Sequence, residues 1–293
     1  LKKLYYNITM DLSEITEIVE FKQIIFNEKY PENIQKLAKN NPDIQVISII
    51  SKSNDLLIHG FIYKKKNLKE NSPVVIYCRG GNNNKSMKIG EIVPSSVFNK
   101  PIFNMIQKNI IVFVSNLRGS SKSQGEDEFG GKDVDDIINL YPIIKKYKVS
   151  NENNISLFGW SRGCTSALLV SKKVKWIKSI ILIAGNYDYS IDKKFRPKFR
   201  KKLIEYFKLS EDDFRKISAI NWVNEIPNVP ILLLHGNNDD AVSVVNSLKL
   251  AIHLFHHKIS YKLVVYPDGD HGLRKYIDQV NNEINNHLDN HIF

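Results

Sequence analysis

The residues Gly159-Trp160-Ser161-Arg162-Gly163 directly follow a short apolar run, residues 155–158. The run predicts a buried strand, and the residues from Arg162 onward predict a helix. A serine at such a junction is typical of a nucleophile elbow, where the turn is too sharp for large side chains two places before or after it. Gly159 and Gly163 meet this requirement, so Ser161 is the candidate nucleophile. The backbone N–H of Arg162, at the positive end of the helix, would face a developing oxyanion.

Short apolar runs alternate with amphipathic helical segments on both sides of this elbow. Such a pattern predicts a parallel sheet covered by helices on both faces. The runs are residues 74–78, 110–114, 155–158, 180–184, 231–234 and 261–265, and two earlier strands are expected at 44–51 and 56–64. The predicted fold is therefore α/β, with a mostly parallel eight-stranded sheet.

The chain divides into an expected N-terminal helical extension, residues 1–43, and a catalytic domain, residues 44–293. Residues 13–40 look like one or two helices, with Pro31 at a first helical turn. The connection 186–228 is too long for a simple loop. We expect it to form a small helical cap.

Composition excludes several classes of function. The net charge is +11, but the lysines are spread along the chain, so we expect a solvated surface rather than nucleic-acid binding. No apolar run is long enough to span a membrane. The N-terminus lacks the features of a signal peptide, although a removed leader remains open. Cys78 and Cys164 fall in buried segments and favour a reducing, cytoplasmic location.

A serine nucleophile needs a base within hydrogen-bond reach. Ligands of such sheets bind beyond the carboxyl ends of the strands, and His271 lies in the loop after the last strand. His235 follows another strand, but we expect it to orient its own loop. The remaining histidines fall on an early strand, on helices or in the tail: His59, His253, His256, His257, His287 and His291.

The base in turn needs an acid that fixes its tautomer. Asp268 and Asp270 are too close to His271 in sequence to reach its far nitrogen. The loop after residue 234 offers Asp239 and Asp240. Either gives the order serine, acid, histidine, which is the order of the α/β-hydrolase fold.

Several stretches together resemble the catalytic domain of the prolyl oligopeptidase family of serine hydrolases, an α/β-hydrolase family. They are Asn116-Leu117-Arg118-Gly119-Ser120, Gly131-Lys132-Asp133-Val134, the elbow, His235-Gly236-Asn237-Asn238-Asp239 and Tyr266-Pro267-Asp268-Gly269-Asp270-His271-Gly272. The resemblance covers residues 44–290. It implies that Asp239 is the catalytic acid and Asp240 its neighbour.

Two departures from the family bear on the substrate. Larger members carry a β-propeller that filters substrates by size, and the residues before the first expected strand are too few to build one. The cap or assembly into a homo-oligomer would then limit substrate size. Many peptidases of the family also have an arginine that grips a substrate carbonyl just after the acid. Here that place is Ala241, and Ser243 replaces a usual proline.

The oxyanion loop is the third departure. It reads Arg79-Gly80-Gly81-Asn82-Asn83, where relatives have tyrosine or histidine before the two glycines. The resemblance implies an oxyanion hole completed by Gly81 and Asn82. Arg79 has two interpretations: it donates to the oxyanion, or it points away and pairs with Glu126 or Asp127. The second is favoured.

Other residues near these motifs are expected to support the structure or to line the pocket. Arg118 is expected to form a buried ion pair, through Asp133. Cys164 is expected to be a packed small residue rather than a reactive thiol. Trp160, Tyr187 and Tyr189 are expected to line the substrate pocket.

A basic cluster, residues 193–202, contains apolar side chains at helical spacing: Phe195, Phe199, Leu203 and Tyr206. One interpretation is a cap helix with its aromatic residues inward and its lysines in water. The alternative is a basic rim that attracts anionic substrates or a membrane surface.

Together these features predict a serine hydrolase that cleaves ester or amide bonds through an acyl-enzyme, with Ser161, Asp239 and His271 as its triad. The expected substrate is a short peptide or a small ester, so peptidase and carboxylesterase both remain open. A non-catalytic binding protein of the same fold is the alternative from another class. No metal or organic cofactor is expected, because the sequence has no metal-ligand spacing and no dinucleotide-binding glycine motif.

Overall fold

The computed structural model describes residues 12–81, 92–120 and 122–293. The strands of these residues form one sheet of nine in the order β1-β2-β3-β5-β4-β6-β7-β8-β9. The strands β4 to β9 are parallel to one another, whereas β1, β2 and β3 join on antiparallel. The sheet is thus mostly parallel, as predicted.

The strands are β1 (Ile18–Gln23), β2 (Ile44–Ser53), β3 (Leu56–Lys65), β4 (Ser72–Cys78), β5 (Ile111–Ser115), β6 (Ser150–Trp160), β7 (Ile177–Ile183), β8 (Ile231–Gly236) and β9 (Tyr261–Tyr266). The α-helices are α2 (Glu32–Asn40), α3 (Lys100–Gln107), α4 (Asp133–Ile138), α5 (Tyr141–Lys146), α6 (Arg162–Lys173), α7 (Asp192–Phe195), α8 (Pro197–Phe207), α9 (Glu211–Ile217), α10 (Val245–His256) and α11 (Ile277–His291). The 3₁₀ turns are η1 (Pro94–Phe98), η2 (Ala219–Asn221), η3 (Val223–Glu225) and η4 (Arg274–Tyr276).

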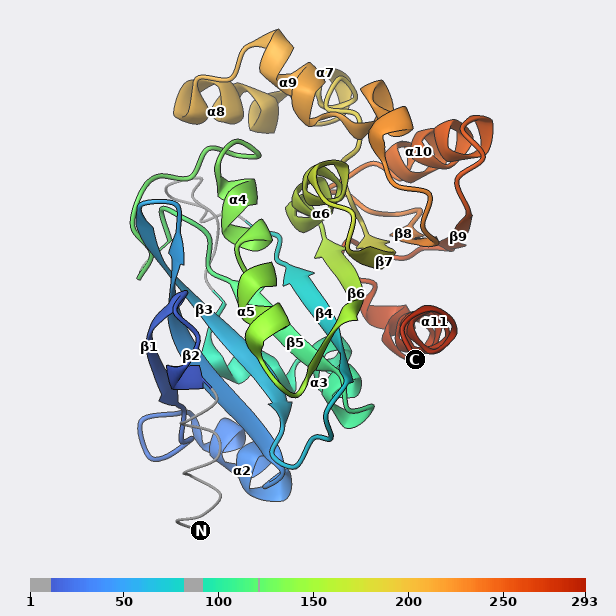
Figure 1. Cartoon of the computed structure of the whole chain (residues 1–293). Coiled ribbons are helices and arrows are strands. Elements are labelled where there is room, and N and C mark those ends of the chain that lie inside the picture. The colour runs from blue at the N-terminus through green and yellow to red at the C-terminus, as the bar shows by residue number, and fades with distance from the viewer. Residues whose placement is uncertain (1–11, 82–91, 121) are drawn as a thin grey trace.

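Helices cover both faces of this sheet (Figure 1). Apolar residues of α4, α5, α6 and α10 form one core against it, including Ile143, Leu168 and Leu254. Residues of α3 and α11, such as Met105 and Leu288, form a second core on the opposite face. Because both faces are covered, the central strands carry continuous buried apolar runs, such as residues 231–234 of β8.

The N-terminal segment differs from the prediction. Residues 18–23 form β1, which pairs antiparallel with β2, where a helix was expected. Within the range where helices were expected, residues 13–40, the longer helical segment is α2. The sheet therefore has nine strands rather than eight. Segment 18–23 fits a strand as well as a helix, and pairing with the exposed edge of β2 decides the outcome.

The connection between β7 and β8 carries the helices α7, α8 and α9 and the turns η2 and η3. These helices lie above the carboxyl end of β6, where the elbow is (Figure 1). This segment is called the cap below. No helix among the described residues is both long and apolar enough to cross a lipid bilayer.

Candidate active site

Ser161 occupies the sharp turn between β6 and α6. Its backbone has φ 56° and ψ −126°, a conformation that a non-glycine residue adopts only when its surroundings impose it. The constraint comes from both sides, because the Ser161 N–H donates to Ile183 O and the Cys164 N–H donates to Ser161 O. A Cβ atom on Gly163 would lie 1.8 Å from the carbonyl oxygen of Cys78. The elbow therefore requires glycine at position 163.

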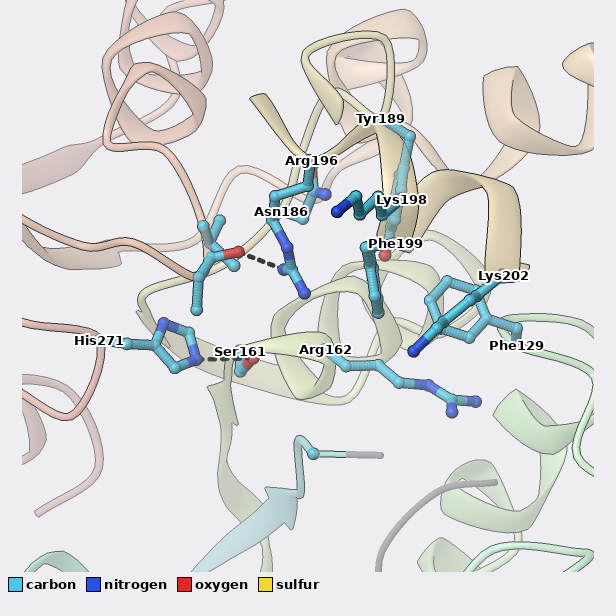
Figure 2. A pocket seen from close by; sticks show the side chains of 13 residues that line it. Phe129, Ser161, Arg162, Asn186, Tyr189, Arg196, Lys198, Phe199, Lys202 and His271 are labelled. Atoms are coloured by element: carbon cyan, nitrogen blue, oxygen red, sulfur yellow. Dashed lines mark hydrogen bonds between the residues drawn. The ribbon is translucent and has the colours of Figure 1, made fainter. Parts of the chain in front are cut away.

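His271 lies next to this serine. Its Nε2 is 3.0 Å from Ser161 Oγ, and its Nδ1 is 2.8 Å from Asp239 Oδ2 (Figure 2 shows the serine contact). Because a carboxylate only accepts, Nδ1 carries the proton and Nε2 accepts from the serine hydroxyl. The structure thus brings the three expected residues together from the ends of β6, β8 and β9.

Asp239 is fixed by four hydrogen-bond donors. Its Oδ1 accepts the backbone N–H groups of Ala241 and Val242, each at 2.8 Å. Its Oδ2 accepts from His271 and lies 3.2 Å from His235 Nε2. Burial by itself would raise the pKa of Asp239, but the hydrogen bonds from His235 and His271 outweigh it and hold the pKa well below its usual range. The carboxylate is therefore ionised throughout the neutral range.

His235 has the orienting role that its position suggested. It is fully buried, its Nδ1 lies 2.7 Å from Ser247 Oγ, and its Nε2 lies 2.9 Å from Val242 O. These contacts hold the loop that carries Asp239 against α10.

Of the residues expected to form the oxyanion hole, those that the structure describes lie around the start of α6 and in the loop after β4. Arg162 is the first residue of that helix, where backbone N–H groups point beyond the helix end. A Cβ atom on Gly80 would lie 2.8 Å from Ser161 Cβ, so the loop after β4 passes directly beside the serine. Gly81, with φ +86°, lines the pocket that opens beside Ser161. Asn82, the other expected oxyanion residue, lies outside the described residues.

The side chain of Arg162 turns away from the serine and is bound by acids. Its two amino groups contact the two oxygens of Asp127, and one lies 3.6 Å from Asp133. The guanidinium also stacks on Phe129, 4.3 Å from the ring centre. Asp127 is thus a partner of Arg162. Burial raises the pKa of Asp133 to about 6, although the charge of Arg162 opposes this.

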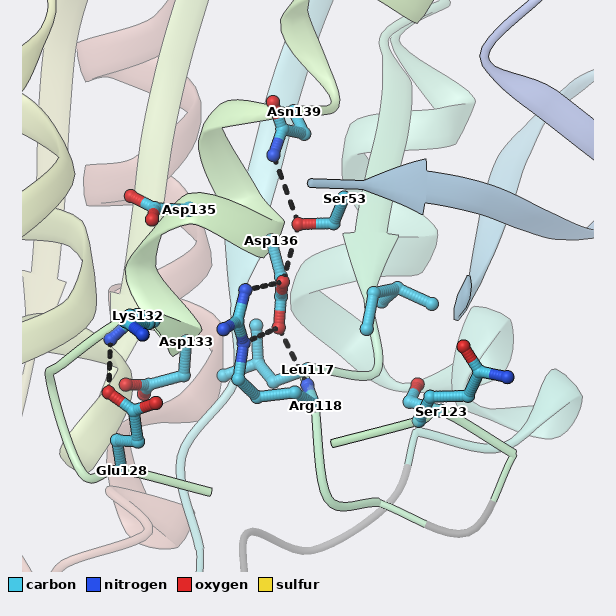
Figure 3. Close-up of polar contacts among 12 residues, drawn as sticks. Ser53, Leu117, Arg118, Ser123, Glu128, Lys132, Asp133, Asp135, Asp136 and Asn139 are labelled. Carbon is cyan, nitrogen blue, oxygen red and sulfur yellow. Dashed lines mark hydrogen bonds and ion pairs between the residues drawn. The ribbon is translucent and has the colours of Figure 1, made fainter. Parts of the chain in front are cut away.

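Arg118 is a buried ion-pair residue, but its partner differs from the expected one. Its Nε and one amino group donate to the two oxygens of Asp136 at 3.1 and 2.7 Å, as Figure 3 shows. Asp133, the expected partner, instead accepts the Gly130 N–H and faces Arg162. Both acids lie on α4, and the helix turns them to different arginines. Sequence spacing alone does not separate such neighbours.

A pocket of about 370 Å³ opens beside Ser161 and His271. Tyr189 lines it, as expected. Tyr187 does not, since it is buried beneath the elbow next to Cys164, and desolvation raises its pKa well above the usual range. Trp160 also lies outside this pocket, with its Nε1 3.4 Å from His271 O. Cys164 is fully buried, and burial raises the pKa of its thiol to about 12, so it is a packed residue.

The cap supplies most pocket residues that the sequence did not identify individually. Asn186, Arg196, Lys198, Phe199 and Lys202 line the pocket. Four of these residues lie in the basic segment 193–202 that the sequence analysis singled out, and no signal in the sequence pointed to Asn186.

The apolar residues of α7 and α8 are only partly inward. Leu203 is fully buried, whereas Phe195 of α7 and Tyr206 of α8 are each 41% exposed. Phe207 packs inward, with its ring centre 5.1 Å from that of Phe129, and Phe199 is half-buried against the core. The helix breaks at Pro197, so the two parts of the cluster do not share one face.

Arg196 makes a particular contact to the acid loop. One of its amino groups donates to the carbonyl oxygen of Ala241 (Figure 2). The peptide group that carries this carbonyl also carries the Val242 N–H, which donates to Asp239. A single peptide group thus joins the cap to Asp239, the acid expected from the sequence.

Comparison with known proteins places this geometry in a family. Residues 96–291 match the prolyl oligopeptidase family. This match spans more than half of the chain, which therefore belongs to that family of serine hydrolases.

Individual relatives are distant. The chain is 23% identical over 180 residues to the uncharacterized peptidase YtmA of Bacillus subtilis, covering 60% of this chain and 66% of YtmA. It is 27% identical over 241 residues to dipeptidyl aminopeptidase B of Saccharomyces cerevisiae, covering 77% of this chain and 27% of the yeast protein.

Solved structures share the fold at low identity. An acylaminoacyl peptidase of Pyrococcus horikoshii aligns with a TM-score of 0.70 and 19% identity, covering 85% of this chain and 42% of that one. A puromycin-hydrolyzing peptidase of Mycobacterium tuberculosis aligns with a TM-score of 0.66 and 18% identity, covering 79% of this chain and 36% of that peptidase. The chain thus spans only part of the length of the proteins that it matches.

Proposed function

We propose that this protein is a serine peptidase that cleaves short peptides through an acyl-enzyme. The observation that carries the proposal is the continuous contact from Ser161 Oγ through His271 to Asp239, at 3.0 and 2.8 Å. The named relatives, a dipeptidyl aminopeptidase and an acylaminoacyl peptidase, support the choice of peptide substrates.

In the proposed reaction, Ser161 Oγ attacks the carbonyl carbon of the scissile amide while His271 Nε2 takes the hydroxyl proton. The backbone N–H groups of Arg162 and Gly81 stabilise the oxyanion. The C–N bond then breaks, and His271 gives its proton to the leaving amine. Water attacks the resulting ester with His271 as base, which releases the acid and restores the serine. Asp239 stabilises the imidazolium in both halves of the reaction.

A fluorophosphonate probe tests the nucleophile. We expect labelling of the wild type and its loss in Ser161→Ala. The Ser120→Ala variant, which alters a serine outside the pocket, should still be labelled. A folded wild type that is not labelled would instead favour the non-catalytic binding protein.

Carboxylesterase activity on small esters is the second candidate, and Ala241 favours it. In many peptidases of the family this place holds an arginine that grips a peptide carbonyl. The two activities can be separated by measuring the turnover of one acyl amino acid in two forms, its p-nitrophenyl ester and its p-nitroanilide. A peptidase turns over the anilide at a substantial fraction of the ester rate, whereas an esterase turns over the ester alone.

We also propose that the protein acts in a reducing compartment, the cytoplasm. Cys78 and Cys164 are both buried free thiols, which supports this location. Fractionation of cells with an antibody to the protein tests it.

A further inference from the structure

The pocket beside Ser161 is lined by charges of one sign. Arg196, Lys198 and Lys202 line it from the cap, and we call these residues the basic trio. No aspartate or glutamate from the described part of the chain lines the pocket. A cationic substrate would therefore meet no opposite charge from these lining residues, whereas an anionic one would meet several.

Arg196 is held in place at the pocket. Its hydrogen bond to Ala241 O fixes one amino group, and its guanidinium stacks on Phe199, 3.8 Å from the ring centre. Figure 2 shows the guanidinium directed toward Ser161 and His271. Because a guanidinium has five N–H donors, most of its hydrogen-bonding capacity is left for a ligand.

The trio differs from the basic residues around it. Arg162 also lines the pocket, but Asp127 and Asp133 neutralise it. On the cap, Lys193 and Arg200 pair with Glu211, and Lys201 pairs with Glu205. Across residues 12–81, 92–120 and 122–293, no ion pair involves Arg196, Lys198 or Lys202. Several outer cations of the cap are thus paired, whereas the pocket cations make no ion pair with a described residue, although the charges of Asp192 and Asp239 also act on Arg196.

We propose that the basic trio binds a carboxylate of the substrate, so that the preferred substrates are acidic peptides or acyl groups. This inference rests on the proposed function and names the substrate class of the same site. Arg196 supplies the directional part of the recognition, because a planar guanidinium matches a carboxylate with two parallel hydrogen bonds. Lys198 and Lys202 are exposed, so their attraction is long-ranged and weakens as salt screens it.

Isosteric substrate pairs test the proposal. The Nα-acetyl-glutamyl and Nα-acetyl-glutaminyl p-nitroanilides, and the matching p-nitrophenyl esters, differ only in one charge. We expect kcat/KM to favour the glutamyl substrate by at least about tenfold at low salt. The ratio should fall toward one in Arg196→Met. It should be unchanged in Lys201→Met, which alters the neighbouring but outward-paired lysine.

The ratio of kcat/KM between the glutamyl and the glutaminyl substrate distinguishes binding of the substrate carboxylate by Arg196 from a purely structural role of this residue. Loss of the contact to Ala241 alone would slow both substrates of a pair equally and leave their ratio intact. A wild-type ratio near one, or a ratio unchanged in Arg196→Met, overturns the proposal.

A binding measurement covers the case in which no substrate is turned over. Calorimetric titration of Ser161→Ala with glutarate and with glutaramide compares a dianion with its neutral analogue. Tighter binding of glutarate that is lost in Ser161→Ala with Arg196→Met supports the site, and equal binding of the two overturns it. Missing fluorophosphonate labelling would defeat the proposed function, whereas labelling with a charge ratio of one would defeat only this inference.

Discussion

Arg118 and Asp136 are joined by three hydrogen bonds in the interior, where their side chains are 5% and 0% exposed. The third bond comes from the backbone N–H of Arg118 and is 2.7 Å long. The pair ties the loop after β5 to α4, and so supports the wall of the site that also carries Asp127.

Removing one partner of this pair should strongly destabilise the fold. Arg118→Met leaves a buried carboxylate without its counter-charge, and we expect a loss of about 3–5 kcal/mol in the free energy of unfolding. Urea unfolding measures this. Lys173→Met is the control, since it breaks an exposed pair with Asp135 and should cost less than about 1 kcal/mol. Equal effects of the two variants would contradict the prediction.

Asp239→Asn should abolish most activity without unfolding the protein. The amide would still accept from Ala241 and Val242, but it would no longer stabilise the His271 imidazolium. We expect kcat to fall by about 10⁴-fold, measured on the best substrate of the ester and anilide screen. Asp240→Asn alters the exposed neighbour and should stay within a few-fold of the wild type. Similar kinetics for both variants would argue against Asp239 as the acid.

Asp133 should make stability fall as the pH rises. Its pKa is raised to about 6, from an ordinary value of 3.8, chiefly by burial. The folded state therefore binds this proton more tightly than the unfolded state. The contribution is fully present below about pH 4 and is lost as the pH rises through about 6.

The Asp133→Asn variant should lack this dependence. The free energy of unfolding of the wild type, relative to the variant, should decline by about 2 kcal/mol between pH 4 and pH 6. Asp135→Asn, an exposed position on the same helix, should show no such decline. Urea unfolding at several pH values checks the difference, and a flat difference would contradict the raised pKa.

Gly163→Ala should destabilise the elbow. The added methyl group would overlap the carbonyl oxygen of Cys78, which is backbone and cannot rotate away. We expect a loss of about 3 kcal/mol or more. At Gly272 the nearest atom to an added Cβ is Arg274 Nε, 3.2 Å away on a flexible side chain. Gly272→Ala should therefore leave the unfolding temperature nearly unchanged, and a comparable drop for both would refute the steric argument.

The parts of the fold that could be predicted are those in which local pattern and tertiary structure agree. Apolar runs that end in glycine or polar residues predicted β4 to β9 within a few residues. The same ends carry Ser161, Asp239 and His271, because parallel strands bring their carboxyl ends to one edge.

The rest depends on contacts between distant segments. Residues 18–23 form a strand because they pair with the free edge of β2. The local sequence pattern does not indicate that this edge is available. Arg118 pairs with Asp136 rather than with the expected Asp133, because the rotation of α4 sets where each carboxylate points. Arg196 was one of many basic residues in its segment. Only the fold of the cap shows that it reaches Ala241.

The peptide group between Ala241 and Val242 has a consequence for catalysis. Arg196 binds its oxygen, and its N–H binds Asp239. A cation at the oxygen end of an amide withdraws electron density and makes the N–H a stronger donor. The charge of a cap residue is thereby felt by the carboxylate that steadies His271. If Arg196 binds the substrate and Asp239 is the catalytic acid, as proposed above, the peptide group of residues 241 and 242 couples these two roles, although the side chain of Ala241 is a single methyl group.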